Sequence, residues 1–231
     1  MLAGLSSVVP PVLSPRAFAR LRAALFVIAL LPLARLFCLG VAGSLGANPV
    51  EFVIRSLGTW TLVALVVTLS ITPLRLATGW AWLLQLRRML GLFAFVYAVL
   101  HFGAYLWLDQ WFDLEAIWKD VLKRPYITAG LAALFLLVPL AVTSSNGWVR
   151  RLGGRNWQRL HRLVYLIAVL AVLHFWWQKA AKNDVGEPLV YAVVLGLLLG
   201  VRLLRWARRR YGGSIDSSAN SSSTVSRRRI S

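Results

Sequence analysis

Long apolar stretches dominate the pattern of hydrophobic and polar positions along this chain. They run for about 16–20 residues, the length that crosses a hydrocarbon core of about 30 Å at 1.5 Å per residue. Helices of a soluble domain would instead show apolar stripes with a polar opposite face. We therefore predict an all-α integral membrane protein, a six-helix transmembrane bundle. The predicted spans are residues 23–39, 57–72, 89–108, 126–143, 160–178 and 189–204.

Composition agrees with this interpretation. Of the 231 residues, 58% are hydrophobic and 11 are Trp, and the mean hydropathy is +0.67. Arg16, Arg20 and Arg22 precede the first apolar stretch, as in a secretory signal peptide. Because that stretch is long enough to span and five more spans follow, we expect an uncleaved first helix.

The net charge of +18 raises the question of a nucleic-acid partner. The Arg residues lie mostly in short segments beside the spans and form no compact basic domain, so we expect none. Seven of the eight acids fall in the connections after spans 1, 3 and 5, and Asp216 is the exception. The positive-inside rule then places both termini in the cytoplasm.

This topology divides the chain into three parts. We predict a cytoplasmic N-terminal segment at residues 1–22 and a six-helix membrane domain at 23–207. Residues 208–231 are rich in Ser and Arg and lack apolar periodicity, which predicts a disordered cytoplasmic tail. Membrane lipid is the surrounding partner, and the closing Arg cluster is either solvated or in contact with anionic lipid.

The three histidines are the main candidates for chemistry, because all lie in or beside apolar spans, where ionisable groups are usually functional. His101 and His174 lie about 18 and 21 Å from the cytoplasmic ends of the third and fifth spans, counted at 1.5 Å per residue. Two imidazoles at one level on facing helices suit bis-histidine haem ligation. The single Cys38 excludes a disulfide within the chain and a cysteine-based cluster.

His161 and Arg35 are less clear candidates. If residues 157–178 form one helix, His161 lies about 20 Å from His174 along its axis and about 140° around it. The residue of the third span that would match the depth of His161 is Arg87, not a histidine. His161 could instead contact a quinone headgroup, a haem propionate or a backbone carbonyl. Arg35, inside the first span, either snorkels outward or pairs with a propionate.

Other functions fit parts of this pattern. Intramembrane histidines can simply hydrogen-bond between helices, or they can relay protons in a transporter. A stand-alone quinol-dependent reductase of ferric iron or another metal is a further alternative. No nucleotide-binding glycine motif is recognisable. Electrons would therefore enter from a partner or a lipid-soluble carrier.

Several motifs resemble the MsrQ family, also called YedZ. They are SLGANPV at 44–50, ITPLR at 71–75, RRMLGL at 87–92, LH at 100–101, RPYITAG at 124–130, and the run 140–177 with TSS, RLGGRNWQRLH and LHFWW. The resemblance covers roughly residues 20–207, including all three histidines. Members are haem-binding membrane subunits of a bacterial periplasmic methionine sulfoxide reductase system. They are related to ferric reductase-like membrane domains.

The resemblance implies an electron-transfer subunit in the bacterial inner membrane, with no catalytic residue for methionine sulfoxide of its own. It implies that His101 and His174 are the axial ligands of a b-type haem. His161 takes the place of a ligand to a second haem, whose partner on the third span is missing. The resemblance further implies FMN, the quinone pool as electron donor and a periplasmic molybdopterin-containing catalytic subunit as acceptor. A separate cytoplasmic flavin reductase is an alternative donor that we also consider.

Overall fold

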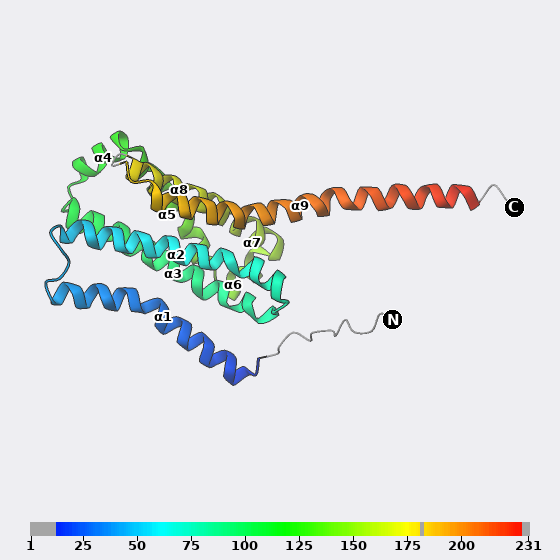
Figure 1. The fold of residues 1–231 in the computed structure, drawn as a ribbon, viewed down its shortest axis with the longest axis horizontal. Helices are drawn as coiled ribbons and strands as arrows, with labels where there is room; N and C mark the ends of the chain where they lie inside the picture. The colour runs from blue at the N-terminus through cyan, green and yellow to red at the C-terminus, as the bar shows by residue number, and fades with distance from the viewer. Residues whose placement is uncertain (1–12, 181–182, 228–231) are drawn as a thin grey trace.

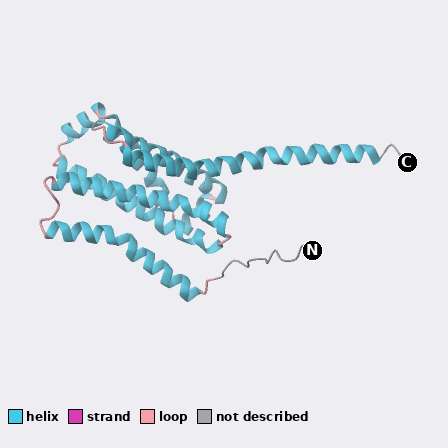
Figure 2. Ribbon diagram, in the orientation of Figure 1, coloured by secondary structure: helices cyan, strands magenta, loops and turns pink. Residues whose placement is uncertain are grey.

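The structure is a computed structural model that describes residues 13–180 and 183–227, with side chains to residue 208. Over these residues it contains helices, turns and loops and no strand (Figure 2). The elements are α1 (Pro15–Val41), α2 (Pro49–Thr78), η1 (Ala81–Gln85), α3 (Leu86–Ala104), η2 (Tyr105–Asp109), α4 (Leu114–Lys123), α5 (Pro125–Val142), α6 (Asn146–Leu152), α7 (Gly154–His161), α8 (Leu163–Ala180) and α9 (Gly186–Arg227).

Six helical segments among the described residues are long and apolar enough to cross a membrane. This confirms the predicted fold class of a six-helix transmembrane bundle. The helices lie side by side along the length of the molecule, and the connections gather at its two ends (Figure 1). The segments are Pro15–Val41, Pro49–Thr78, Ala81–Asp109, Pro125–Val142, Gly154–Ala180 and Gly186–Arg208.

Local chemistry explains where several of these helices begin. Ser14 and Asn48 accept hydrogen bonds from the backbone of Ala17 and Glu51, which satisfies N–H groups of the first turn. Proline follows each of these caps, and it also opens α5. The fixed φ of proline suits the first helical position, where its missing N–H costs nothing.

Helix α1 bends in its middle (Figure 1), and Pro32 inside the helix accounts for a bend because proline removes a backbone hydrogen bond. Near this point the hydroxyl of Tyr97 on α3 donates to the backbone oxygen of Ala29 at 2.7 Å. This bond ties α1 to the bundle beside its bend.

The structure differs from the sequence prediction in two connections. The connection between the third and fourth spans contains α4, whose first turn is capped by Asp113. The fifth span is not one helix, because α7 ends at His161 and α8 starts at Leu163. The segment predicted as one helix over residues 157–178 therefore spans as expected, within Gly154–Ala180, but is divided at Arg162. The N–H of Tyr165 bonds to the carbonyl of Arg162, three residues back, which tightens the chain at the break.

The tail also differs, because α9 continues as a helix to Arg227, where the sequence predicts disorder from residue 208. A helix that already exists can extend without a new nucleus. Figure 1 shows this extension leaving the bundle. Residues 228–231, and residues 1–12 of the predicted N-terminal segment, lie outside the described residues.

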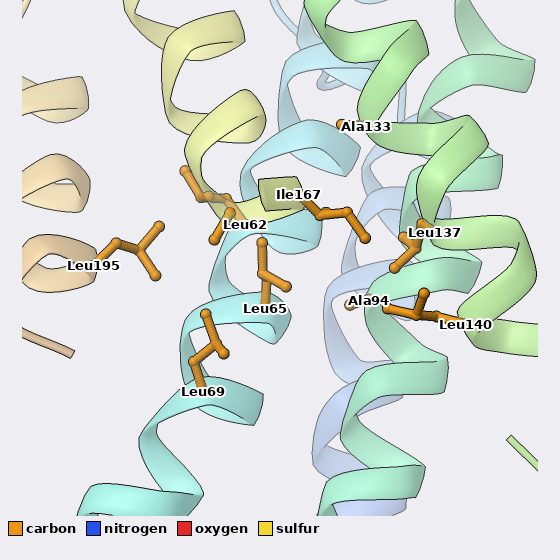
Figure 3. Packing of buried hydrophobic residues seen from close by; sticks show 10 residues of the cluster. Leu62, Leu65, Leu69, Ala94, Ala133, Leu137, Leu140, Ile167 and Leu195 are labelled. Atoms are coloured by element: carbon orange, nitrogen blue, oxygen red, sulfur yellow. The ribbon is translucent and has the colours of Figure 1, made fainter. Parts of the chain in front are cut away.

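The main core lies between α2, α3, α5, α8 and α9, where small residues allow close helix packing. Ala168 and Ala94 are 0% and 1% exposed. Leucines of α2 and α5 and Ile167 of α8 fill the space between the helices, and Leu195 reaches in from α9 (Figure 3). This layer separates the two ends of the bundle. Its buried members are Leu62, Leu65, Leu69, Ala94, Ala133, Leu137, Leu140, Ile167, Ala168 and Leu195.

Candidate functional site

The structure brings together His101 of α3 and His174 of α8. Their ring centroids are 6.0 Å apart and the ring planes cross at 80°. With about 2 Å for each metal–nitrogen bond and about 1 Å from nitrogen to ring centre, two imidazoles on opposite sides of one metal have centroids about 6 Å apart. The separation therefore fits two ligands of a single ion.

Backbone carbonyls of two further helices orient these rings. His101 Nδ1 lies 2.9 Å from the oxygen of Ile54 on α2, and His174 Nδ1 lies 2.7 Å from that of Tyr126 on α5. A carbonyl oxygen only accepts, so each Nδ1 must carry the proton and donate it. In the neutral imidazole this leaves the lone pair on Nε2. A metal-binding histidine is usually held in this way.

A cavity of about 930 Å³ contains both histidines. Its volume lies within the range of about 300–1,000 Å³ that is typical of ligand and cofactor sites. Apolar side chains of the main core form its inner wall, among them Leu65, Leu137 and Ile167. The part of the cavity lining that belongs to the main core is therefore apolar.

Cationic side chains also line the cavity. Arg35 of α1 is one of them, and it makes no hydrogen bond or ion pair with another described residue. Arg55 of α2 forms an ion pair with Glu51 at 2.7 Å, yet its buried Nε has no hydrogen-bond partner among the described residues. A buried unsatisfied donor is costly, so a group in the cavity that accepts from Arg55 would be stabilised.

The remaining cations of the cavity are paired within the protein. Lys179 at the end of α8 lies 2.5 Å from Asp184 and 3.3 Å from Glu187, and its side chain is 10% exposed. Arg124 pairs with Asp120 at 3.3 Å. The hydrogen bond and the charge of Lys179 lower the pKa of Asp184 below its usual range. This pairing persists as the pH falls toward the usual carboxyl range and is lost when the pH passes through the lowered pKa.

His161 lies apart from the His101–His174 pair and is not part of the cavity lining. Its Nε2 is 3.1 Å from the hydroxyl of Thr143 at the end of α5, and its ring stacks on Trp157 with centroids 3.9 Å apart. Trp157 in turn donates to the carbonyl of Thr143 at 2.8 Å. The structure places no second histidine beside His161 within the described residues.

Sequence reasoning missed several residues of this site. Arg55 precedes the predicted second span of residues 57–72, so the sequence places it in a connection, although it belongs to α2. The carbonyls of Ile54 and Tyr126 gave no signal, because backbone oxygens are common to every residue. The glycines Gly58 and Gly130, which lie against the two imidazoles, did carry a signal. A glycine inside a helical pattern often marks a close approach.

Comparison with known proteins decides the family. Residues 57–172, about half of the chain, match the family described as ferric reductase like transmembrane component. The protein-methionine-sulfoxide reductase heme-binding subunit MsrQ of Herminiimonas arsenicoxydans is 50% identical over 208 residues, which is 90% of this chain and 95% of that protein. The chain belongs to the MsrQ family.

Other MsrQ proteins show similar agreement. The subunit of Bordetella pertussis is 56% identical over 198 residues, covering 86% of this chain and 96% of its own length. That of Rhodospirillum rubrum is 55% identical over 196 residues, covering 85% and 93%. No solved structure matches the chain. Membership of a transmembrane family, together with six helices able to span, makes this a multi-pass membrane protein.

Proposed function

We propose that this MsrQ-family chain is the haem-binding electron-transfer subunit of a methionine sulfoxide reductase system, with one b-type haem between His101 and His174. One observation carries the proposal. The two imidazoles lie in one cavity with their centroids 6.0 Å apart. Each ring donates a hydrogen bond from Nδ1 to a backbone carbonyl, which leaves Nε2 available to bind a metal. The relatives named above are haem-binding subunits by name, which supports the same cofactor here.

The donor set fits haem better than a bare metal ion. No group of three or more His, Cys, Asp or Glu is placed to hold an ion within the described residues. Structural zinc takes four protein ligands, whereas a b-type haem needs only axial ligands from the protein. The unsatisfied Nε of Arg55 and the guanidinium of Arg35, both at the cavity, suit the two propionates. The apolar inner wall suits the macrocycle.

When bound, the haem supplies a one-electron redox couple. His101 and His174 would hold it through Nε2, and the guanidinium groups of Arg35 and Arg55 would donate to its propionate carboxylates. Leu65, Leu137 and Ile167 would give it an apolar surface that excludes water. Reduction of a methionine sulfoxide to methionine and water consumes two electrons and two protons. We infer that the chain delivers the two electrons one at a time to a separate catalytic subunit.

The donor and acceptor lie on opposite sides of the membrane in this proposal. Electrons enter from the quinone pool or a cytoplasmic flavin reductase. They leave at the His101–His174 end to a periplasmic molybdopterin-containing subunit, which places the chain in the bacterial inner membrane. The excess of Arg at the other end, by the positive-inside rule, supports this orientation.

We propose a single haem because the half of the bundle that contains His161 offers no second pair of ligands among its described residues. His161 already has Thr143 and Trp157 as partners, and the neighbouring position on α3 holds Arg87. We therefore assign His161 a role in packing α7 against α5 instead of iron ligation. The family resemblance also implies FMN, but no described group of residues singles out a site for it. We include no flavin step in the mechanism.

Optical spectra of the purified chain test this proposal. We expect the dithionite-reduced protein to show a shifted Soret band and a sharp α-band, as low-spin haem does. His101→Ala and His174→Ala should each abolish that signal, and His161→Ala should keep it. A wild-type protein without a haem spectrum would contradict every haem function. Loss of haem only in His161→Ala would contradict the ligand assignment.

A further inference from the structure

The two imidazoles lie against glycines at matching positions of α2 and α5. His101 donates to the carbonyl of Ile54, and Gly58 follows Ile54 by four residues on α2. His174 donates to the carbonyl of Tyr126, and Gly130 follows Tyr126 by four residues on α5. The same arrangement therefore occurs twice, once for each ring.

Helix geometry explains the spacing of four. In an α-helix the carbonyl of residue i points toward the N–H of residue i+4. A ring from a neighbouring helix that reaches this carbonyl must therefore lie over residue i+4. A Cβ on Gly130 would lie 2.7 Å from His174 Nδ1 and 2.9 Å from its Cε1. Since non-bonded carbons approach to about 3.5–4.0 Å, a side chain there would take the space of the ring.

We propose that Gly58 and Gly130 are positioning residues that direct both Nε2 lone pairs at one iron. The proposal rests on the proposed function, since it concerns how the two axial ligands are aligned. Glycine inside a helix is unfavourable relative to alanine, so its presence here needs a local reason. Gly196 of α9 shows the contrast, because a Cβ there would meet nothing within 4 Å.

The two sites differ in how much room they leave. A Cβ on Gly58 would lie 3.1 Å from His101 Nδ1 and Cε1, a contact that a shift of a few tenths of an ångström relieves. At Gly130 the contact is 2.7 Å, and His174 has to move away. The geometry therefore predicts a graded effect, larger at Gly130 than at Gly58.

Spectroscopy of the full chain with its haem tests this gradient. We expect Gly130→Ala to lose most of the low-spin signal in optical and EPR spectra. Gly58→Ala should keep a low-spin haem but change its EPR signature and midpoint potential. The control, Gly196→Ala, should match the wild type in all of these. A wild-type spectrum and potential in Gly130→Ala, or an equal loss in Gly196→Ala, would overturn the proposal.

A second experiment separates a displaced ring from general misfolding. Thermal midpoints of the haem-free full chain are compared for Gly130→Ala alone, His174→Ala alone and the two together. The clash exists only when the imidazole is present, so Gly130→Ala should lower the midpoint in the wild-type background and not in the His174→Ala background. An equal loss in both backgrounds would overturn the proposal. This cycle remains decisive even if the wild type binds no haem, an outcome that refutes only the proposed function.

Discussion

At the scale of single residues, Arg55 is the positively charged group that we expect to influence the cavity most. It pairs with Glu51 at 2.7 Å, while its buried Nε finds no partner among the described residues. Hydrogen bonds to charged groups contribute about 1.5–3 kcal/mol when both partners are satisfied. A carboxylate in the cavity would give Arg55 that partner. Arg55 should therefore stabilise the more negative, reduced state of the site.

We predict that Arg55→Gln lowers the midpoint potential of the haem. Removing a nearby positive charge disfavours the added electron, and a loss of about 1.4 kcal/mol corresponds to about 60 mV for a one-electron couple. A potentiometric titration followed at the α-band measures the shift. Arg16→Gln, on an exposed position near the start of α1, is the matched control and should leave the potential unchanged. A rise in potential in Arg55→Gln would contradict this role.

The sequence placed the two histidines at one depth, because counting residues from the ends of two spans requires only the helical rise. It could not predict what orients the rings. His101 and Ile54 are 47 residues apart in the chain, and His174 and Tyr126 are 48 apart. Such contacts depend on which helices become neighbours and on how each is rotated, and a single sequence does not specify either.

At the scale of elements, the break between α7 and α8 lies directly beside His161. The chain tightens at Arg162 directly after this histidine, and the imidazole meets Thr143 at 3.1 Å and the ring of Trp157. These contacts join α7 to the end of α5. The break therefore serves packing at this end of the bundle.

The contact between His161 and Thr143 should appear in stability and not in the haem spectrum. We predict that His161→Ala and Thr143→Val each destabilise the protein by about 0.5–1.5 kcal/mol, the usual range for one hydrogen bond. The double variant should cost less than the sum, because the two changes remove the same bond. Unfolding curves in detergent measure these differences. Loss of the haem signal in Thr143→Val would show that this region supports the cofactor directly.

Spans and short helices differ in how well the sequence predicts them. The six spans follow from the length of apolar runs, a signal set by membrane thickness. Helix α4 was missed, although Asp113 caps it and Glu115 pairs with Lys119 at 2.5 Å four residues later. A helix of 10 residues is too short to stand out beside the much longer spans. The break at Arg162 depends on tertiary contacts and leaves no sequence signal.

At the scale of the whole molecule, the two ends of the bundle differ in their chemistry. The cavity with His101 and His174 occupies the end where the α1–α2 and α8–α9 connections lie, since Asn48 and Glu187 also line it. His161 and the Arg-rich α6–α7 region lie at the other end. A leucine-rich core lies between them. This arrangement suits a protein that passes electrons toward one face.

We predict that these two ends face opposite sides of the membrane, with the cavity end outside. In a Cys38→Ser background, Ser44→Cys in the α1–α2 connection should react with a membrane-impermeant maleimide added to spheroplasts. Asn146→Cys, at the start of α6, should react only after permeabilisation. Both positions are exposed, so access to the reagent depends on the side of the membrane alone. The reverse pattern would contradict the orientation inferred from the Arg residues.

The most direct measurement of the central claim is the haem content per chain, combined with EPR of the ferric protein. We propose one low-spin haem with two imidazole ligands, because His101 and His174 lie together while His161 contacts Thr143. We predict one haem per chain in the wild type and in His161→Ala, and none in His101→Ala or His174→Ala. Two haems per chain, or a low-spin haem that survives loss of His101 or His174, would contradict the account.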